Sequence, residues 1–323
     1  MTSALFRSNH LWRAYGIGLL VLVLLLLALS ASEQLARYPG GGQPLYLWMQ
    51  QLPEPLLLTL NLLFLVGGAV LFNELLVHEK ISQGYNSLFF LAYLMAGLAY
   101  LPWLGLQPAI YPSFLLMFIL RNMMIAGNSR RQLSLVFDAG LLGGIAFLIY
   151  QPAWVLFPIS FLSIMLGGML RWRGLLLWLL GYGTPFYLLA AIAYLMNNQG
   201  LFWSVFDFAD FDFVQLHLPN EAQKLLLALI LSLFIMGVAI SFVGGNLKTN
   251  ALRNAQRIFF ILLICSVVAI LFLPGDGWMN AAMFYPVGAF YLGRMLESIP
   301  KKSWFNLLML LWLGLLLVNS GIF

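Results

Sequence analysis

Long apolar runs recur along the whole chain, and they restrict the fold more than any other feature of the sequence. A helix needs roughly 17–25 apolar residues to cross a bilayer, and about eleven runs approach or meet this length. They are 14–31, 55–77, 85–101, 109–125, 135–151, 153–170, 174–196, 224–243, 258–273, 280–297 and 304–320. Backbone polar groups in lipid must be hydrogen-bonded within the chain, which helices achieve. The sequence therefore predicts an all-α, polytopic transmembrane bundle of about 11 helices.

Composition leads to the same class of protein. Hydrophobic residues make up 62% of the 323-residue chain and charged residues 8%, whereas a soluble domain has about 25% charged residues. So few charges cannot cover a water-facing surface, and we expect one integral membrane domain over 1–323. The run 14–31 is longer than the apolar region of a signal peptide and is expected to remain as the first helix. The segments 32–54 and 197–223 are long enough to be partly structured.

The positions of lysine and arginine predict an orientation. Of the 16 such residues, only Arg37 and Lys224 fall on one side of the alternating loops, and the other 14 fall on the opposite side. Basic loops stay in the cytoplasm, so we expect a membrane protein with a cytoplasmic N-terminus and a C-terminus on the outer side. The net charge of +5 follows from these loops and indicates no nucleic-acid partner.

The segment 136–158, VFDAGLLGGIAFLIYQPAWVLFP, predicts a tight helical hairpin. Gly140 and Gly144 have the G-x-x-x-G spacing that lets another helix or a lipid chain lie close to the backbone. The Gln-Pro pair at 151–152 interrupts the apolar run, and a second run follows. Asp138 places a carboxylate near the start of the hairpin.

Four charged residues lie inside apolar runs or at their cytoplasmic ends: Glu74, Arg121, Asp138 and Arg294. Charges at this depth are costly and usually paired, so Arg121 is expected to pair with Glu74 or Asp138. Long side chains could instead extend to the membrane surface. The functional interpretation is a polar site for a phosphate headgroup or a proton.

The outer side carries the candidates for catalysis. Glu33 follows the first run and could act as a general base if it is partly buried. Asp207, Asp210 and Asp212 lie among aromatic residues, where they could bind a divalent cation through oxygen, with Asp207 and Asp210 as the first candidates. That cation, or Arg37, could hold a lipid phosphate. The alternative is that these acids are simply solvated, so no metal site is firmly predicted and the cofactor stays open.

Several other chemistries find no support in the sequence. The single cysteine, Cys265, excludes an intramolecular disulfide. His10, His78 and His217 have no metal-ligand spacing. The chain contains no P-loop, zinc-protease or nucleophile-elbow motif.

Two blocks carry a resemblance to known membrane proteins. Residues 73–124, beginning NELLVHEKISQGYNSLFF, and residues 136–162 resemble an uncharacterised family of bacterial polytopic inner-membrane proteins. This resemblance implies a location in the bacterial inner membrane, with the C-terminus in the periplasm. A further likeness is to the membrane domain of GT-C glycosyltransferases. The positions that follow a phrase common in those enzymes are Gly140, Leu141, Leu142, Gly144, Ala146, Leu148, Pro152, Leu156 and Pro158. Tyr150 stands where that phrase has lysine. The second resemblance implies a GT-C-like topology, a polyprenyl-phosphate-linked sugar as substrate, and a catalytic carboxylate early in the first outer loop, where Glu33 lies.

Three functions are compatible with these features. The leading hypothesis is GT-C-like handling of a polyprenyl-phosphate-linked sugar in cell-envelope glycan assembly, with membrane lipids as partners. The alternative is a non-catalytic membrane subunit or scaffold of an envelope or secretion complex, whose partners the sequence does not name. A transporter is third, because no matched halves with broken helices are visible.

Overall fold

The computed structural model describes residues 45, 48, 49, 51–78, 81, 87–98, 108–126, 132–166, 172–206, 221–243, 250–272, 280, 282–299 and 302–319. Eleven α-helices and two short 3-10 segments make up this part of the chain, which contains no strand. They are α4 (Glu54–His78), α5 (Leu88–Gly97), α6 (Ile110–Ala126), α7 (Gln132–Ile149), η2 (Gln151–Val155), α8 (Leu156–Leu166), α9 (Trp172–Leu195), α10 (Gly200–Trp203), η3 (Ser204–Phe206), α11 (Glu221–Val243), α12 (Asn250–Phe272), α14 (Tyr285–Ser298) and α15 (Lys302–Asn319). The prediction of an all-α fold is confirmed for these residues.

Only some helices are long enough to cross a bilayer. Three described stretches qualify by length and composition, namely Thr59–His78, Trp172–Leu195 and Lys224–Phe242. The other apolar helices of the described part are shorter. Each expected run from 55–77 onward overlaps a helix, whereas the run 14–31 lies outside the described residues. The described structure thus supports helices at the expected positions. By length and composition, three of the described helices could span a membrane.

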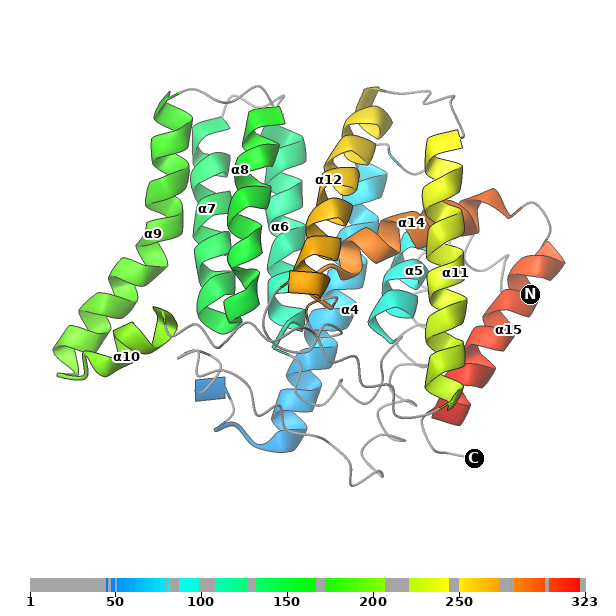
Figure 1. The fold of residues 1–323 in the computed structure, drawn as a ribbon, viewed down its shortest axis with the longest axis horizontal. Helices are drawn as coiled ribbons and strands as arrows, with labels where there is room; N and C mark the ends of the chain where they lie inside the picture. Colours follow the sequence, from blue (N-terminus) through cyan, green and yellow to red (C-terminus); the bar gives the residue numbers. More distant parts are fainter. Residues whose placement is uncertain are drawn as a thin grey trace.

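The longer helices stand roughly side by side (Figure 1). The helices α6, α7, α8 and α9 form one side of the bundle, α11 and α15 the other, and α4 and α12 lie between them. The helix α9 bends along its length (Figure 1), and it contains Pro185, a residue that removes a backbone hydrogen bond and kinks a helix. The helix α14 runs across the bundle rather than along it (Figure 1).

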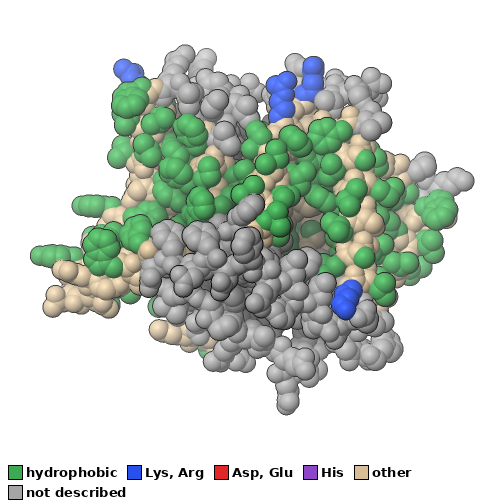
Figure 2. Space-filling view, in the orientation of Figure 1, with side chains coloured by type: hydrophobic (Ala, Val, Ile, Leu, Met, Phe, Trp, Pro, Cys, Tyr) green, Lys and Arg blue, Asp and Glu red, His purple; other side chains and the backbone are tan. Residues whose placement is uncertain are grey.

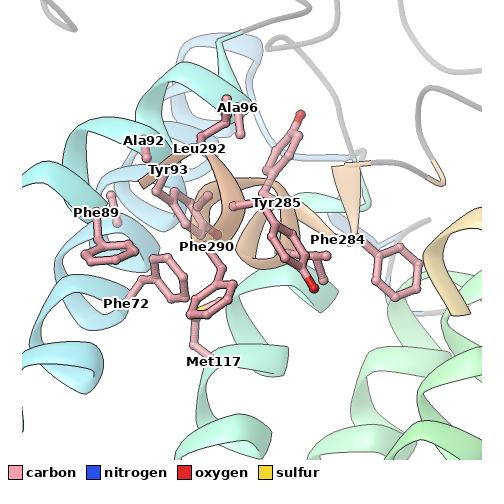
Figure 3. Close-up of a cluster of buried hydrophobic side chains, with 14 of the residues drawn as sticks. Phe72, Phe89, Ala92, Tyr93, Ala96, Met117, Phe284, Tyr285, Phe290 and Leu292 are labelled. Carbon is pink, nitrogen blue, oxygen red and sulfur yellow. The ribbon is translucent and has the colours of Figure 1, made fainter. Parts of the chain in front are cut away.

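The core is built around the two short helices α5 and α14, which pack on each other. Every residue of α5 is buried, as are most residues of α14. Figure 3 shows the aromatic cluster at their contact. Phe290 of α14 stacks on Phe259 of α12 with ring centroids 4.1 Å apart, and on Phe89 of α5 at 6.4 Å. A helix that is apolar on all faces must be buried, either in protein or in lipid. The helix α5 is buried by the surrounding helices of the protein.

These two helices correct the expected spans 85–101 and 280–297. The described α5 has ten residues and α14 has fourteen, which correspond to about 15 and 21 Å of helix. Neither reaches the roughly 30 Å of a bilayer core. The apolar run at α5 is therefore explained by burial inside the bundle.

The outer faces of the bundle are apolar. Exposed large side chains include Leu180 and Leu188 on α9, Leu231 on α11 and Leu310 on α15. Figure 2 shows hydrophobic side chains covering the visible helices over most of their length. Lysine and arginine side chains lie at the upper end, over the starts of α9 and α12, with one more low on α11 (Figures 1 and 2).

Candidate functional site

A pocket opens between the C-terminal ends of α4 and α6. Its volume is about 290 Å³, and its lining is Leu71, Glu74, Leu75, His78, Met117, Phe118 and Arg121. The four residues from α4 follow the i, i+3, i+4, i+7 pattern, which places them on one face of that helix. The three from α6 share a face in the same way. Ligand pockets typically measure about 300–1,000 Å³, so this one has room for a small polar group and part of an apolar chain.

The pocket combines opposite charges with an apolar wall. Glu74 and Arg121 are both exposed, and among the described residues neither forms an ion pair or hydrogen bond with the other. His78 lies one turn beyond Glu74 and adds an imidazole ring to the same lining. Leu71, Met117 and Phe118 supply the apolar side. Such a lining can bind a charged group at one end and a hydrocarbon at the other.

The site lies close to the ends of its two helices. Glu74 is four residues before the end of α4, and Arg121 is five residues before the end of α6, which corresponds to about 6–8 Å along each axis. The starts of α9 and α12 lie at the same end of the bundle (Figure 1). Arg173 is in the first turn of α9, Arg253 is in the first turn of α12, and Arg257 is one turn further along α12.

The expected pairing of Arg121 is not found in the described structure. Among the described residues Arg121 forms no ion pair with Glu74 or Asp138. Asp138 belongs to α7, is half-buried, and is not among the residues that line the pocket. Glu74 and Arg121 lie at similar distances from the ends of their helices and line one pocket, but their charged groups are not in contact.

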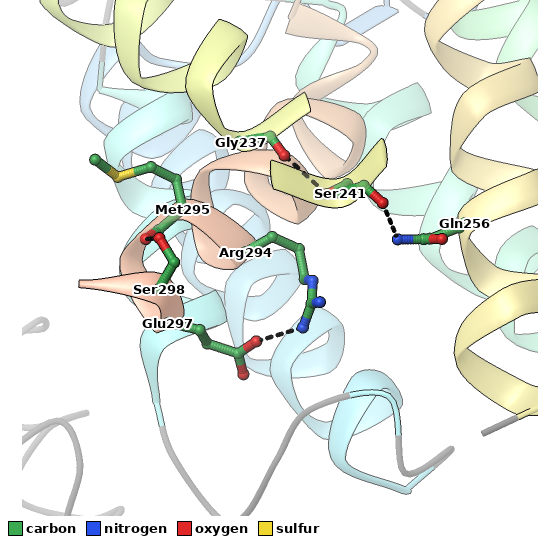
Figure 4. Close-up of polar contacts among 7 residues, drawn as sticks. All are labelled: Gly237, Ser241, Gln256, Arg294, Met295, Glu297 and Ser298. Carbon is green, nitrogen blue, oxygen red and sulfur yellow. Dashed lines mark hydrogen bonds and ion pairs between the residues drawn. The ribbon is translucent and has the colours of Figure 1, made fainter. Parts of the chain in front are cut away.

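Arg294 has a different partner from those considered in the sequence. Its Nη1 donates to Oε2 of Glu297, one turn further along α14, at 2.9 Å, and both side chains are largely buried. Figure 4 shows this pair beside a polar link between α11 and α12. In that link Nε2 of Gln256 donates to the backbone oxygen of Ser241 at 2.9 Å. The Nε atom of Arg294 is buried without a partner. The local ion pair lowers the cost of a charge inside the bundle, which is a structural role.

Gly140 and Gly144 face α9. A Cβ atom at Gly140 would overlap the carbonyl oxygen of Trp178, and one at Gly144 would lie 2.5 Å from the carbonyl oxygen of Tyr182. Gly181 on α9 makes the reciprocal approach to the backbone of α7 at Phe137. Small residues on both helices thus bring the two backbones into contact.

The structure does not test the predicted catalytic and headgroup-binding residues. Glu33, Arg37, Asp207, Asp210 and Asp212 all fall outside the described residues. The helix α10 and the start of α4 lie at the lower end of the bundle in Figure 1, opposite the pocket. Within the described part no group of three His, Cys, Asp or Glu side chains could hold a metal.

Sequence reasoning missed the pocket as a unit. It considered Glu74 and Arg121 as partners and set His78 aside because it lacks metal-ligand spacing. The available signal was the spacing of Glu74 and His78 on one face of α4, together with Arg121 at a similar distance from the end of α6. Comparison with known proteins adds no further constraint, because no family model, curated protein or solved structure matches this chain.

Proposed function

We propose that this chain is a multi-pass protein of the bacterial inner membrane that binds the phosphate headgroup of a membrane lipid between α4 and α6. The observation that carries this proposal is the pocket in which Arg121 and Glu74 lie without pairing. Ionisable residues within membrane helices are rare, and they usually mark ligand or ion sites. The guanidinium of arginine matches phosphate through parallel hydrogen bonds.

Placement in a membrane is supported by the helix surfaces. The helix α9 has 24 residues, about 36 Å of length, and carries exposed aromatic residues at both ends. Trp172 is 73% exposed and Tyr194 is 75% exposed, in positions that suit the two interfaces of a bilayer. The basic residues at the starts of α9 and α12 support a cytoplasmic location for that end, and hence for the pocket.

The apolar wall of the pocket supports a lipid rather than a water-soluble phosphate. Leu71, Met117 and Phe118 line the same space as Arg121. An acyl or prenyl chain gains free energy by leaving water for such a surface, while the phosphate stays with the arginine. A free phosphate ion would contact Arg121 but would leave the apolar residues of the lining without a ligand.

GT-C-like handling of a polyprenyl-phosphate-linked sugar is the finer form of this proposal. This form of the proposal rests on the sequence resemblance and needs a second site. Sugar transfer would use Glu33 as a base on the outer side, with Arg37 or a cation held by Asp207 and Asp210 against the phosphate, whereas the α4–α6 pocket is assigned to the cytoplasmic end. A polyprenyl phosphate also carries no cation for Glu74. A non-catalytic membrane subunit would need no ligand in the pocket at all.

Lipid binding can be tested with an Arg121→Gln variant. The full-length protein is purified in mild detergent, supplied with total bacterial lipid extract, and bound phospholipid is quantified by native mass spectrometry. Loss of a hydrogen bond to a charged group costs about 1.5–3 kcal/mol, so Arg121→Gln should weaken binding by about tenfold or more.

The matched control is Arg173→Gln. Arg173 is exposed at the same end of the bundle but does not line the pocket, and its replacement should leave binding unchanged. Equal lipid occupancy in the parent protein and Arg121→Gln would remove the proposed function and favour the non-catalytic subunit.

A further inference from the structure

The α4–α6 pocket carries one anion and one cation rather than an excess of positive charge. Glu74 contributes a carboxylate and Arg121 a guanidinium, and His78 adds a ring that can donate or accept a hydrogen bond. An anionic headgroup would be attracted by Arg121 and repelled by Glu74. A site selected for negative charge alone has no use for the glutamate.

We propose that the pocket binds a zwitterionic headgroup that contains a phosphate and a primary ammonium, as in phosphoethanolamine lipids. The inference rests on the proposed lipid-binding function and names the class of lipid. The guanidinium of Arg121 donates hydrogen bonds to the phosphate oxygens, and the carboxylate of Glu74 accepts hydrogen bonds from the ammonium. Each charge of the ligand then meets a counter-charge that the protein supplies from a different helix.

The absence of a Glu74–Arg121 ion pair in the described structure supports this arrangement. Both side chains are exposed, so a direct ion pair between them would add little stability, and each can reach a ligand without breaking such a pair. Here they line the same 290 Å³ space without contact. A zwitterion placed between them satisfies both, whereas a direct pair would close the space.

Other common headgroups satisfy only part of the lining. Phosphatidylglycerol offers a phosphate but no cation, so Glu74 stays unpaired beside an anion. Phosphatidylcholine offers both charges, but its trimethylammonium has no N–H donor for the carboxylate and is larger. Only the primary ammonium supplies a positive charge and hydrogen-bond donors in a small volume.

Headgroup selectivity tests the inference on the unaltered protein. The purified full-length chain is exchanged into mixed micelles with equimolar dioleoyl phosphatidylethanolamine, phosphatidylglycerol and phosphatidylcholine, and the bound lipids are identified by native mass spectrometry. One charge-assisted hydrogen bond corresponds to about a tenfold preference for phosphatidylethanolamine over each of the others. A separate arm adds glycerophosphoethanolamine, which should compete poorly because it lacks chains to contact Leu71, Met117 and Phe118.

The Glu74→Gln variant gives the opposite prediction for the anionic lipid. Removing the carboxylate should abolish the preference for phosphatidylethanolamine and raise binding of phosphatidylglycerol, while Arg173→Gln keeps the parent selectivity. Equal binding of the three lipids by the parent protein, still dependent on Arg121, overturns this inference and leaves the proposed function standing. Binding that does not depend on Arg121 overturns both. Tight competition by glycerophosphoethanolamine overturns the lipid assignment in favour of a soluble phosphoethanolamine compound.

Discussion

Gly144 shows how one missing side chain determines a helix contact. Its Cα lies against the backbone of α9, where a Cβ atom would be 2.5 Å from the oxygen of Tyr182 and 3.0 Å from Cγ of Pro185. Backbone atoms cannot move aside as a flexible side chain can. The G-x-x-x-G spacing in the sequence predicted a close approach by a helix or a lipid chain, but it could not identify α9 as the partner.

Gly144→Leu should therefore destabilise the protein by about 1–3 kcal/mol through overpacking. The free energy of unfolding is measured by titrating the purified protein in mixed micelles with SDS. Gly183→Leu is the matched control on the facing helix, because a Cβ atom at Gly183 meets nothing within 4 Å. Equal stability of the two leucine variants would contradict the packing between α7 and α9.

The charged residues show what the distance of a residue from its helix end can and cannot predict. Counting residues from the helix ends placed Glu74, Arg121 and Asp138 at one level, and the pocket contains the first two. Which face of α7 meets α6 depends on packing between helices, and an all-apolar helix carries little information about its rotation. The sequence could therefore predict that charged residues lie near the ends of these helices, but not which of them line the pocket.

At the scale of elements, α5 and α14 distinguish enclosed helices from membrane-spanning ones. The sequence predicted helices at the right places because apolar runs of this length are rare in other structures. It could not separate burial in protein from burial in lipid, because both environments favour the same side chains. Length was the one available signal, since the expected run 85–101 is already short for a bilayer.

Phe290→Ala should be among the most damaging changes in the core. The ring of Phe290 is fully buried and lies between Phe89 and Phe259, so its removal should cost about 3–5 kcal/mol of unfolding free energy. Phe260→Ala is the control, because Phe260 is 40% exposed on the outer face of α12. The same SDS titration compares them. A Phe290→Ala variant as stable as Phe260→Ala would mean that α14 is not part of the core.

For the molecule as a whole, the apolar surface and the basic residues at one end support the proposed orientation of the bundle in a membrane. Among the described helices, three have the length and composition to span it, and the helix surfaces visible in Figure 2 are largely apolar between the two ends. The basic end carries the α4–α6 pocket. By the positive-inside rule, the proposed lipid site is expected on the cytoplasmic side.

The most direct test of this account is the position of the two ends of α9. In a Cys265→Ser background, Arg173→Cys and Asn198→Cys place single thiols at exposed positions near the two ends of that helix. The cells are treated with a membrane-impermeant maleimide before and after the inner membrane is permeabilised. Asn198→Cys should be labelled in intact cells, and Arg173→Cys should be labelled only after permeabilisation. Labelling of both thiols in intact cells, or of Arg173→Cys alone, would contradict it.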